Sequence, residues 1–300
     1  MADGATQAIL TEAREGVDAR LDAWATRLEA EVGGTAGAAL AYALRSPGKR
    51  VRAALVLASY RAVGGTADGI IEVAAAVETV HAYSLVHDDL PCMDDDDLRR
   101  GRPTTHVAYD VATATRAGWV MVPVAARVLA AGAEALGHPL SGLQAMSREL
   151  FVASGPEGMV GGQWLDLEAE KRELDLPGLI KVHQGKTGAL IRASCALGGL
   201  AARAPERQVE ALRRFGSAIG LAFQVADDVL DVTATSADLG KTAGKDELSD
   251  KSTYVRLLGV DGARAEADRL ATAAVEHLRS AGVESGALGA LARYIVDRDR

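Results

Sequence analysis

Aromatic residues are scarce in this sequence: tryptophan, tyrosine and phenylalanine together make up 4% of its 300 residues. Sheet sandwiches and barrels rely on aromatic and β-branched side chains for packing, so this scarcity argues against an all-β fold. Hydrophobic residues still make up 48% of the chain, which is enough for one large core or two smaller ones. With alanine abundant, the composition favours packed helices.

Cysteine is also nearly absent, and only Cys92 and Cys195 occur. Two cysteines do not make the disulfide framework of a secreted domain, and we expect both as free thiols buried among small apolar side chains. The N-terminal residues lack the basic start and apolar stretch of a signal peptide. No apolar run of about 18 residues predicts a membrane span. Together these absences predict a cytoplasmic protein.

Positive charge is in deficit, with 33 lysines and arginines against 41 acidic residues and a net charge of −8. This balance argues against a nucleic-acid partner. The basic residues that do cluster lie at Lys49-Arg50-Val51-Arg52, Arg99-Arg100, Lys186, Lys241, Lys245 and Lys251. Local basic clusters in an acidic chain suit a small anionic ligand better than a polymer.

Apolar residues recur at three- and four-residue spacing through most of the chain. The clearest stretches are 53–63, 70–86, 120–135, 179–200 and 209–230. Sustained alternation is missing, so we expect few strands or none. Glycine and proline breaks divide the chain into about ten or more helices, which predicts one all-α domain over residues 1–300 around a central active-site cavity. The polar stretch 233–253 is expected to be a surface loop.

Two aspartate clusters interrupt apolar segments. The first comprises Asp88, Asp89 and Asp94, and the second comprises Asp227, Asp228 and Asp231. Burying a carboxylate is costly unless it is paired, neutralised or bound to a cation. Magnesium fits best, because it accepts one or two carboxylates and fills its other positions with water and phosphate oxygens.

The two clusters are built differently. Asp227, Asp228 and Asp231 have the spacing i, i+1, i+4, which places the first and last on one helical face. The alternative for this cluster is a helix cap or a solvated acidic turn. In the first cluster, Pro91 ends the helix after Asp89, so a loop must return Asp94 to the same site.

The acidic run 94–97 is followed directly by Leu98-Arg99-Arg100-Gly101. Four consecutive aspartates are usually a solvated charge run, but anions and cations so closely interleaved indicate a magnesium–diphosphate complex with arginines on its outer oxygens. Two acidic sites facing each other across a bundle would hold one diphosphate between magnesium ions. Phosphate-loop and kinase signatures are missing, so we expect the group that leaves the diphosphate to be a stabilised carbocation.

An ordered set of motifs resembles the trans-isoprenyl diphosphate synthases, of the bacterial farnesyl/geranylgeranyl type, over roughly residues 45–260. The motifs are Gly48-Lys49-Arg50-Val51-Arg52, residues 81–91, Asp94 through Gly101, Gly161-Gly162-Gln163 with Asp166, Lys186-Thr187-Gly188, Phe223-Gln224 with Asp227-Asp228 and Asp231, Gly240-Lys241, and Lys251-Ser252-Thr253-Tyr254. The resemblance implies the helical isoprenoid synthase fold, a homodimer and three magnesium ions.

The resemblance also implies roles for single residues. Isopentenyl diphosphate would be bound by Lys49, Arg52, His81 and Arg100. The allylic diphosphate (dimethylallyl, geranyl or farnesyl) would be bound by Arg99, Lys186, Lys241 and Lys251, and its magnesium ions by the two aspartate clusters. Thr187 and Gln224 would lie beside the allylic cation. A lone histidine on an apolar helix is more often a core residue, and only the surrounding match favours a binding role for His81; His87 and His106 are expected to be structural.

Product length is expected to depend on Tyr83 and Ser84, which lie about one helical turn before Asp88. In resembling enzymes an aromatic residue there accompanies shorter products, so we expect a C15 product, with C10 next and C20 after it. Trp119 would shorten the product further if it faced the same tunnel. The alternative is that Tyr83 packs between helices and Trp119 faces solvent or a partner.

The stretch 109–123 departs from the family pattern, with Val111 in place of an acid, Trp119 in place of an aspartate and Pro123 inside the helical run. Two alternatives to a synthase remain. A terpene cyclase would use the same metal clusters but would not need the isopentenyl diphosphate residues. A non-catalytic partner subunit would tolerate the altered helix but would not need intact aspartate clusters.

Overall fold

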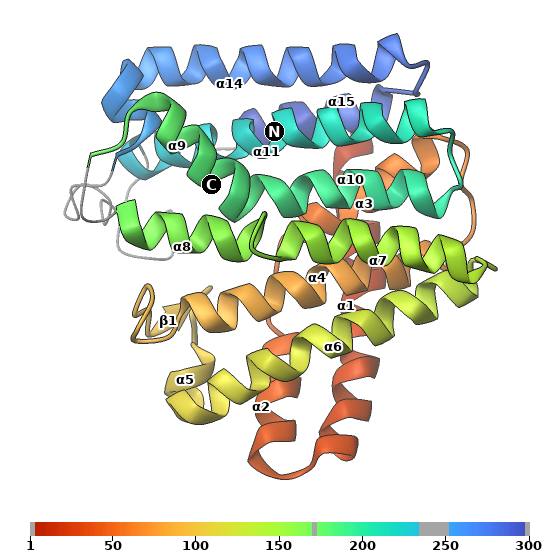
Figure 1. Cartoon of the computed structure of the whole chain (residues 1–300), viewed down its shortest axis with the longest axis vertical. Helices are drawn as coiled ribbons and strands as arrows, with labels where there is room; N and C mark the ends of the chain where they lie inside the picture. The colour runs from red at the N-terminus through yellow and green to blue at the C-terminus, as the bar shows by residue number, and fades with distance from the viewer. Residues whose placement is uncertain (1–3, 170–172, 234–251, 298–300) are drawn as a thin grey trace. The chain divides into compact units, whose positions relative to one another are not determined.

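The computed structural model describes residues 4–169, 173–233 and 252–297. Within these ranges the chain forms helices almost throughout, which confirms the all-α prediction (Figure 1). The strands that these residues form are the two-residue pieces β1 (Leu98–Arg99) and β2 (Arg102–Pro103), which pair antiparallel.

The residues group into two compact units. The amino-terminal unit comprises Ile9–Leu57 and Ala67–Ser147, and the carboxy-terminal unit comprises the described parts of Met1–Ala8, Ala58–Thr66 and Arg148–Arg300. Each unit combines segments that are far apart in the sequence, so no single cut of the chain separates them. That residues 1–300 act as one domain, with a central cavity, stays a prediction.

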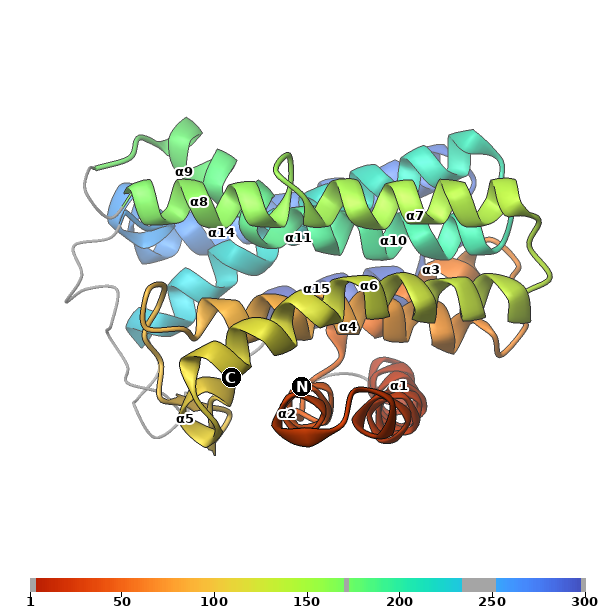
Figure 2. The same ribbon diagram turned by 60° about the horizontal axis from the view of Figure 1, so that its bottom comes forward.

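The amino-terminal unit contains most of α1 (Gly4–Val32), with α2 (Gly34–Leu44), α4 (Ile70–Asp88), α5 (Thr105–Ala108) and α6 (Val111–Ala135). Helices α1 and α2 form an antiparallel hairpin (Figures 1 and 2). Helices α4 and α6 pack closely along their length. Their approach depends on Gly132, where an added Cβ would lie 2.9 Å from the backbone nitrogen of Val73.

The carboxy-terminal unit contains α8 (Met159–Ala169), α9 (Leu176–His183), the π-helix η1 (Gln184–Gly188), α10 (Ala189–Ala201), α11 (Glu206–Thr233), α14 (Tyr254–Ser280) and α15 (Gly286–Val296). Helix α11 packs against both α10 and α14. Val225, Val229 and Tyr254 belong to the apolar core that α11 shares with α14. By sequence, α3 (Val51–Ala62) and α7 (Leu140–Ser154) each contribute residues to both units.

Helix α6 begins nine residues earlier than the apolar pattern predicts, because Asp110 caps it: its carboxylate accepts the backbone N–H of Thr113 at 2.7 Å. Pro123 lies inside this helix. Among the described helices, α6 is also the one long and apolar enough to cross a membrane, although half of the apolar window is buried within the protein. A buried helix of a core has the same composition.

Two local predictions were wrong. The continuous helix expected over 179–200 is interrupted by η1, a wide turn that apolar spacing does not reveal. The two short strands at 98–103, where two arginine-containing pieces pair, agree with the expectation of few strands or none. Cys92 is exposed, because it follows Pro91 in the turn after α4, whereas Cys195 is buried as expected. Most of the predicted loop 233–253 lies outside the described residues.

Candidate active site

The first aspartate cluster lies at the C-terminal end of α4. The helix ends at Asp88, and Asp89 is its C-cap. The loop then turns back, because the backbone N–H of Asp94 donates to the carbonyl oxygen of Asp88 at 2.8 Å. This bond confirms that a loop, and not helical spacing, returns Asp94 to Asp88.

Asp88 and Asp89 lie in different surroundings. Asp88 is half-buried, while Asp89 is 4% exposed and accepts a hydrogen bond from Arg99 Nε at 2.6 Å. Burial raises the pKa of Asp89, and the Arg99 guanidinium opposes that rise. Asp89 is therefore already paired with a cation of the protein, and its role as a metal ligand stays a prediction.

Three of the residues expected to bind isopentenyl diphosphate come together in the amino-terminal unit. Arg52 Nη1 lies 3.4 Å from His81 Nε2. Burial, followed by the charges of Arg52 and Arg100, lowers the pKa of His81 well below its usual range. His81 is therefore neutral near pH 7 and can offer one N–H donor beside two guanidinium groups.

A buried ion pair that the sequence did not suggest supports this cationic cluster. Arg50 donates to Glu78 Oε2 at 3.1 Å and to Asp18 Oδ1 at 2.8 Å. Glu78 Oε1 also accepts the backbone N–H of Ala53 at 3.2 Å, in the first turn of α3. Glu78 thus ties the start of α3, next to Arg52, to α4. The available signal was a lone acid inside the apolar run 73–80.

The hairpin β1–β2 positions Arg99 and Arg100. Its two-residue loop is Arg100-Gly101, with φ of 54° and 74°, the pattern of a type I′ turn. The Arg100 guanidinium donates to the carbonyl oxygen of Pro47, two residues before Lys49. A Cβ on Gly48 would lie 2.6 Å from Arg100 Nη1, so glycine allows this approach. Lys49 itself is exposed.

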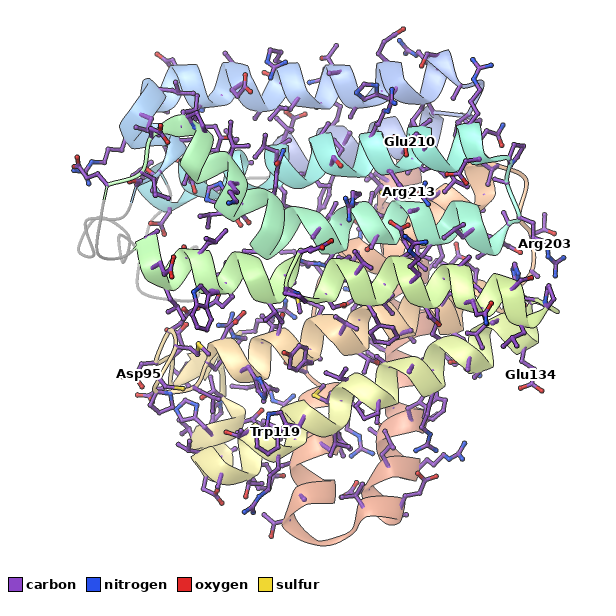
Figure 3. The ribbon with its side chains drawn as sticks, viewed as in Figure 1. Asp95, Trp119, Glu134, Arg203, Glu210 and Arg213 are labelled. Atoms are coloured by element: carbon purple, nitrogen blue, oxygen red, sulfur yellow. The ribbon has the colours of Figure 1, made fainter. Side chains whose placement is uncertain are left out.

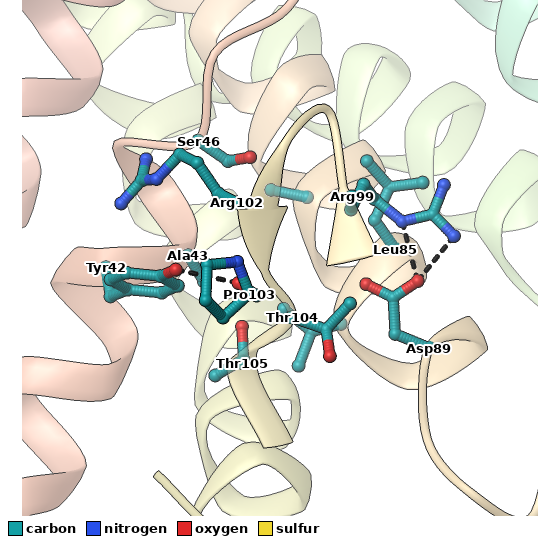
Figure 4. Close-up of a pocket in the computed structure, with 12 residues that line it drawn as sticks. Tyr42, Ala43, Ser46, Leu85, Asp89, Arg99, Arg102, Pro103, Thr104 and Thr105 are labelled. Atoms are coloured by element: carbon teal, nitrogen blue, oxygen red, sulfur yellow. Dashed lines mark hydrogen bonds and ion pairs between the residues drawn. The ribbon is translucent and has the colours of Figure 1, made fainter. Parts of the chain in front are cut away.

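A small cavity lies beside this hairpin (Figure 4). The Asp89–Arg99 pair borders it on one side, and Arg102 stacks on the Tyr42 ring at 4.4 Å on the other. Its volume of about 30 Å³ has room for one or two waters. This is too small for a diphosphate, so the cavity is not the substrate site.

The second aspartate cluster occupies the last two turns of α11 in the carboxy-terminal unit. Asp227 and Asp231 are half-buried. Asp228 is 8% exposed, and its Oδ2 accepts the backbone N–H of Tyr254, the first residue of α14, at 2.7 Å. As in the first cluster, the second aspartate of the pair is held by the protein itself.

Lys186 and Thr187 lie on the π-helix η1. Lys186 Nζ lies 2.7 Å from Asp166 Oδ2 of α8. The backbones of α8 and η1 are nearly in contact, because a Cβ on Gly162 would lie 1.9 Å from the backbone nitrogen of Lys186. Next to it, the Gln163 side chain is buried, and neither of its amide atoms has a hydrogen-bond partner among the described residues. Asp166 belongs to one of the sequence motifs, but its residue type and spacing indicated no role for it.

Thr187 and Gln224 lie on two elements that pack through glycine. A Cβ on Gly220 of α11 would lie 2.7 Å from the Cα of Gly188, the residue after Thr187. Gln224 follows Gly220 by one helical turn and is half-buried. Lys241 and Lys251 lie outside the described residues.

The residues expected to set product length are separated by the structure. Tyr83 and Ser84 are half-buried on α4. Trp119 is 66% exposed and lies on α6 (Figure 3), on the side opposite the buried residues of that helix. The structure therefore favours the alternative, in which Trp119 faces solvent or a partner, because helical periodicity places it almost opposite the buried Met121.

Magnesium fits the aspartates that are present. Among the described residues, no group of three or more histidine, cysteine or acidic side chains is already gathered around a metal position. Magnesium does not need such a cage, because it binds through one or two carboxylates and takes its other ligands from water and phosphate. Half-buried Asp88, Asp94, Asp227 and Asp231 are of that kind.

Comparisons with known proteins agree with this geometry. The family model described as polyprenyl synthetase matches residues 35–284. The farnesyl diphosphate synthase of Geobacillus stearothermophilus is 38% identical over 299 residues, which covers 100% of both chains. An FPP/GFPP synthase structure from Zymomonas mobilis has a TM-score of 0.84 at 34% identity and covers 97% of this chain and 98% of that one. A Helicobacter pylori geranyltransferase, solved with magnesium and isoprenyl diphosphate, has a TM-score of 0.78 at 30% identity, covering 98% and 95%.

Proposed function

Because the chain belongs to the polyprenyl synthetase family and is a trans-prenyltransferase, we propose that it condenses isopentenyl diphosphate with an allylic diphosphate to give a C15 trans-prenyl diphosphate, with magnesium as its cofactor. The product length follows the farnesyl diphosphate synthase that it resembles. The half-buried aromatic ring of Tyr83, about one turn before Asp88, supports the same length.

One observation carries this proposal: Arg52, neutral His81 and Arg100 gather next to Lys49. These residues form a cationic site for a diphosphate, on residues other than those expected to hold the allylic substrate. A terpene cyclase has no second diphosphate to bind and would not need this site. The cluster therefore favours condensation of two substrates.

Magnesium would be held by Asp88 and Asp94 in one unit and by Asp227 and Asp231 in the other. It would neutralise the charge that develops on the leaving diphosphate. The related Helicobacter pylori enzyme was solved with magnesium, which supports this cofactor. Asp89 and Asp228 would act mainly by holding Arg99 and Tyr254 in place.

The remaining residues bind or orient the allylic substrate. Lys186, with its ammonium held by Asp166, would bind the allylic diphosphate as a point charge. The Thr187 hydroxyl and the Gln224 amide oxygen would place dipoles beside the allylic cation. Attack by the isopentenyl double bond is followed by loss of a proton, which the departing pyrophosphate would accept.

A single assay tests the function. Purified protein is incubated with magnesium, isopentenyl diphosphate and each allylic primer, and products are extracted before and after phosphatase treatment. We expect elongated alcohols only after phosphatase. Hydrocarbons without phosphatase would instead identify a cyclase, and the absence of any product would favour a non-catalytic partner subunit.

Removing one proposed magnesium ligand tests the metal assignment. Asp88→Ala and Asp227→Ala should each lower kcat by about 10²-fold, the scale for loss of one electrostatic stabiliser. Asp297→Ala is the control, because it removes an aspartate that belongs to neither cluster and lies at the end of α15. Turnover near the wild-type value in either cluster variant would refute that cluster's role.

We also propose that the protein is a cytoplasmic homodimer, by its likeness to the family. The exposed apolar side chains of Val111, Trp119 and Val122 on α6 support a partner surface on that helix. Light scattering should give the dimer mass at micromolar concentration, and a monomer mass throughout would contradict the proposal.

A further inference from the structure

The side of α4 that bears Tyr83 contacts α6 through His87. The Tyr83 and His87 rings meet edge to face, with centroids 4.9 Å apart and planes at 67°. On its other side, His87 Nε2 lies 3.2 Å from the carbonyl oxygen of Thr115 on α6. Since a carbonyl oxygen only accepts, the tautomer protonated at Nε2 makes this hydrogen bond. The imidazole is thus held between the Tyr83 ring and the carbonyl oxygen of Thr115.

Gly118 provides the space for this imidazole. A Cβ at that position would lie 2.1 Å from His87 Nε2 and 2.4 Å from its Cδ2, well inside van der Waals contact. Glycine is a weak helix former, and Gly118 is buried in the middle of α6. The packing of His87 is the reason that the structure offers for a glycine here.

We propose that His87 is a positioning residue for product length: seated against Gly118 of α6, it fixes the Tyr83 ring that limits the growing hydrocarbon chain. This inference rests on the proposed function, in which the chain extends past Tyr83 from a diphosphate held at Asp88. His87 acts through Tyr83 and not on the substrate. Helix α6 therefore influences product length through its buried Gly118 and not through Trp119, which is 66% exposed.

Substitution of His87 tests whether the ring braces Tyr83. His87→Ala removes the brace, so the ratio of longer products to the wild-type product should rise by at least about tenfold, as it should for Tyr83→Ala. His87→Phe keeps an aromatic edge against Tyr83 and should retain the wild-type ratio. His87→Gln can still donate to Thr115 but has no ring, so it should lengthen products as alanine does. Chromatography of dephosphorylated products measures all four.

Gly118→Ala tests the contact with α6 from the other side. Its methyl group should force the imidazole towards Tyr83 and shift products to shorter chains. In the His87→Ala background there is no ring to displace, so the same substitution should leave the product ratio unchanged. Trp119→Ala is the matched control on the next residue and should leave chain length as in the wild type.

The outcomes separate this inference from the proposed function. If the wild-type protein makes no elongated product, the proposed function fails. If Tyr83→Ala lengthens products while His87→Ala and His87→Gln do not, His87 is not a positioning residue. An equal effect of Gly118→Ala with and without His87 would also overturn the inference. Circular dichroism of each variant identifies any that does not fold, and His87→Gln then replaces His87→Ala.

Discussion

At the scale of single residues, strain marks the candidate site. Among the described residues, the non-glycine residues with positive φ are Arg50, Asp95, Arg100 and Arg203. Arg50 and Asp95 are next to the predicted binding residues Lys49 and Asp94, and Arg100 is itself a predicted binding residue. Such conformations cost of the order of 1 kcal/mol or more each and persist where the surrounding structure enforces them. At these positions, the backbone conformation that places the guanidinium and carboxylate groups also lowers the local stability of the fold.

Arg100→Asn should separate binding from stability. Asparagine adopts positive φ readily, so relief of strain should offset the lost hydrogen bond to Pro47 and keep the free energy of unfolding within about 1 kcal/mol of the wild type. KM for isopentenyl diphosphate should rise about tenfold or more, the scale for loss of a charged hydrogen bond. Urea titration and steady-state kinetics measure the two effects. A KM equal to that of the wild type would remove Arg100 from the binding site.

His183 should make stability depend on pH. Burial is the main reason that its pKa falls from 6.5 to about 4. The Asp166 charge opposes this fall, and the Lys186 charge adds to it. Between these values the unfolded chain binds more protons than the folded one, so stability is fully present above about pH 6.5 and is lost as the pH falls towards 4.

His183→Phe removes this titration while keeping a ring beside Tyr254, whose centroid lies 5.8 Å away. The wild-type protein should lose up to about 3 kcal/mol more than the variant between pH 6.5 and 4. Urea unfolding at several pH values gives the difference. Parallel pH profiles for the two proteins would show that His183 titrates normally.

At the scale of elements, short irregular pieces position the chemistry and long helices supply the frame. The π-helix η1 presents Lys186 and Thr187, and the type I′ turn of the β1–β2 hairpin presents Arg100. Neither changes the apolar spacing of the sequence, so neither was predictable from it. Glycines lie where the π-helix and the hairpin turn contact neighbouring segments, because the chain segments approach there more closely than a Cβ would permit.

Gly162→Ala should disturb η1 without unfolding the protein as a whole. The new methyl group would lie 1.9 Å from the backbone nitrogen of Lys186, so α8 and η1 must move apart. A displacement of about 1 Å at a positioned group can cost 10²-fold in rate, and we expect a loss of that order in kcat. Helix content by circular dichroism should be retained.

The control for this variant is Gly289→Ala on α15, where the nearest atom to an added Cβ is 3.5 Å away, an ordinary contact. It should leave kcat unchanged and should be neutral or slightly stabilising, since alanine favours the helix. Equal kcat in the two variants would show that the α8–η1 contact does not position Lys186.

At the scale of the whole molecule, each unit carries one aspartate cluster, and the proposed function requires both. Magnesium and inorganic pyrophosphate added together should therefore raise Tm, since a ligand bound only by the folded state adds about 2.7 kcal/mol at 100 times its Kd. Either one alone should do little, because the carboxylates and the diphosphate need each other's charge. Differential scanning fluorimetry measures the shift.

Asp88→Ala and Asp227→Ala should each reduce that Tm shift, and Asp297→Ala should not. A full shift in one cluster variant would mean that the complex binds without that cluster. An equal shift with calcium in place of magnesium would show that charge alone, and not magnesium geometry, is sufficient.

The sequence by itself determined the helical class, most helix positions and the residue types of the chemistry. Those properties are local: apolar spacing sets a helix, proline and glycine end it, and carboxylates inside apolar runs indicate a cation. The end of α4 after Asp88 and the loop that returns Asp94 followed from the same local rules.

Only the tertiary structure decided the partners of Asp89 and Asp228. The pairing of Asp89 with Arg99 and of Asp228 with the N–H of Tyr254, the support of Arg50 by Glu78, and the exposure of Trp119 all depend on segments distant in the sequence. Spacing along one helix gives the relative directions of its side chains. It cannot say which direction faces a neighbour, because that depends on how the other helices pack around it.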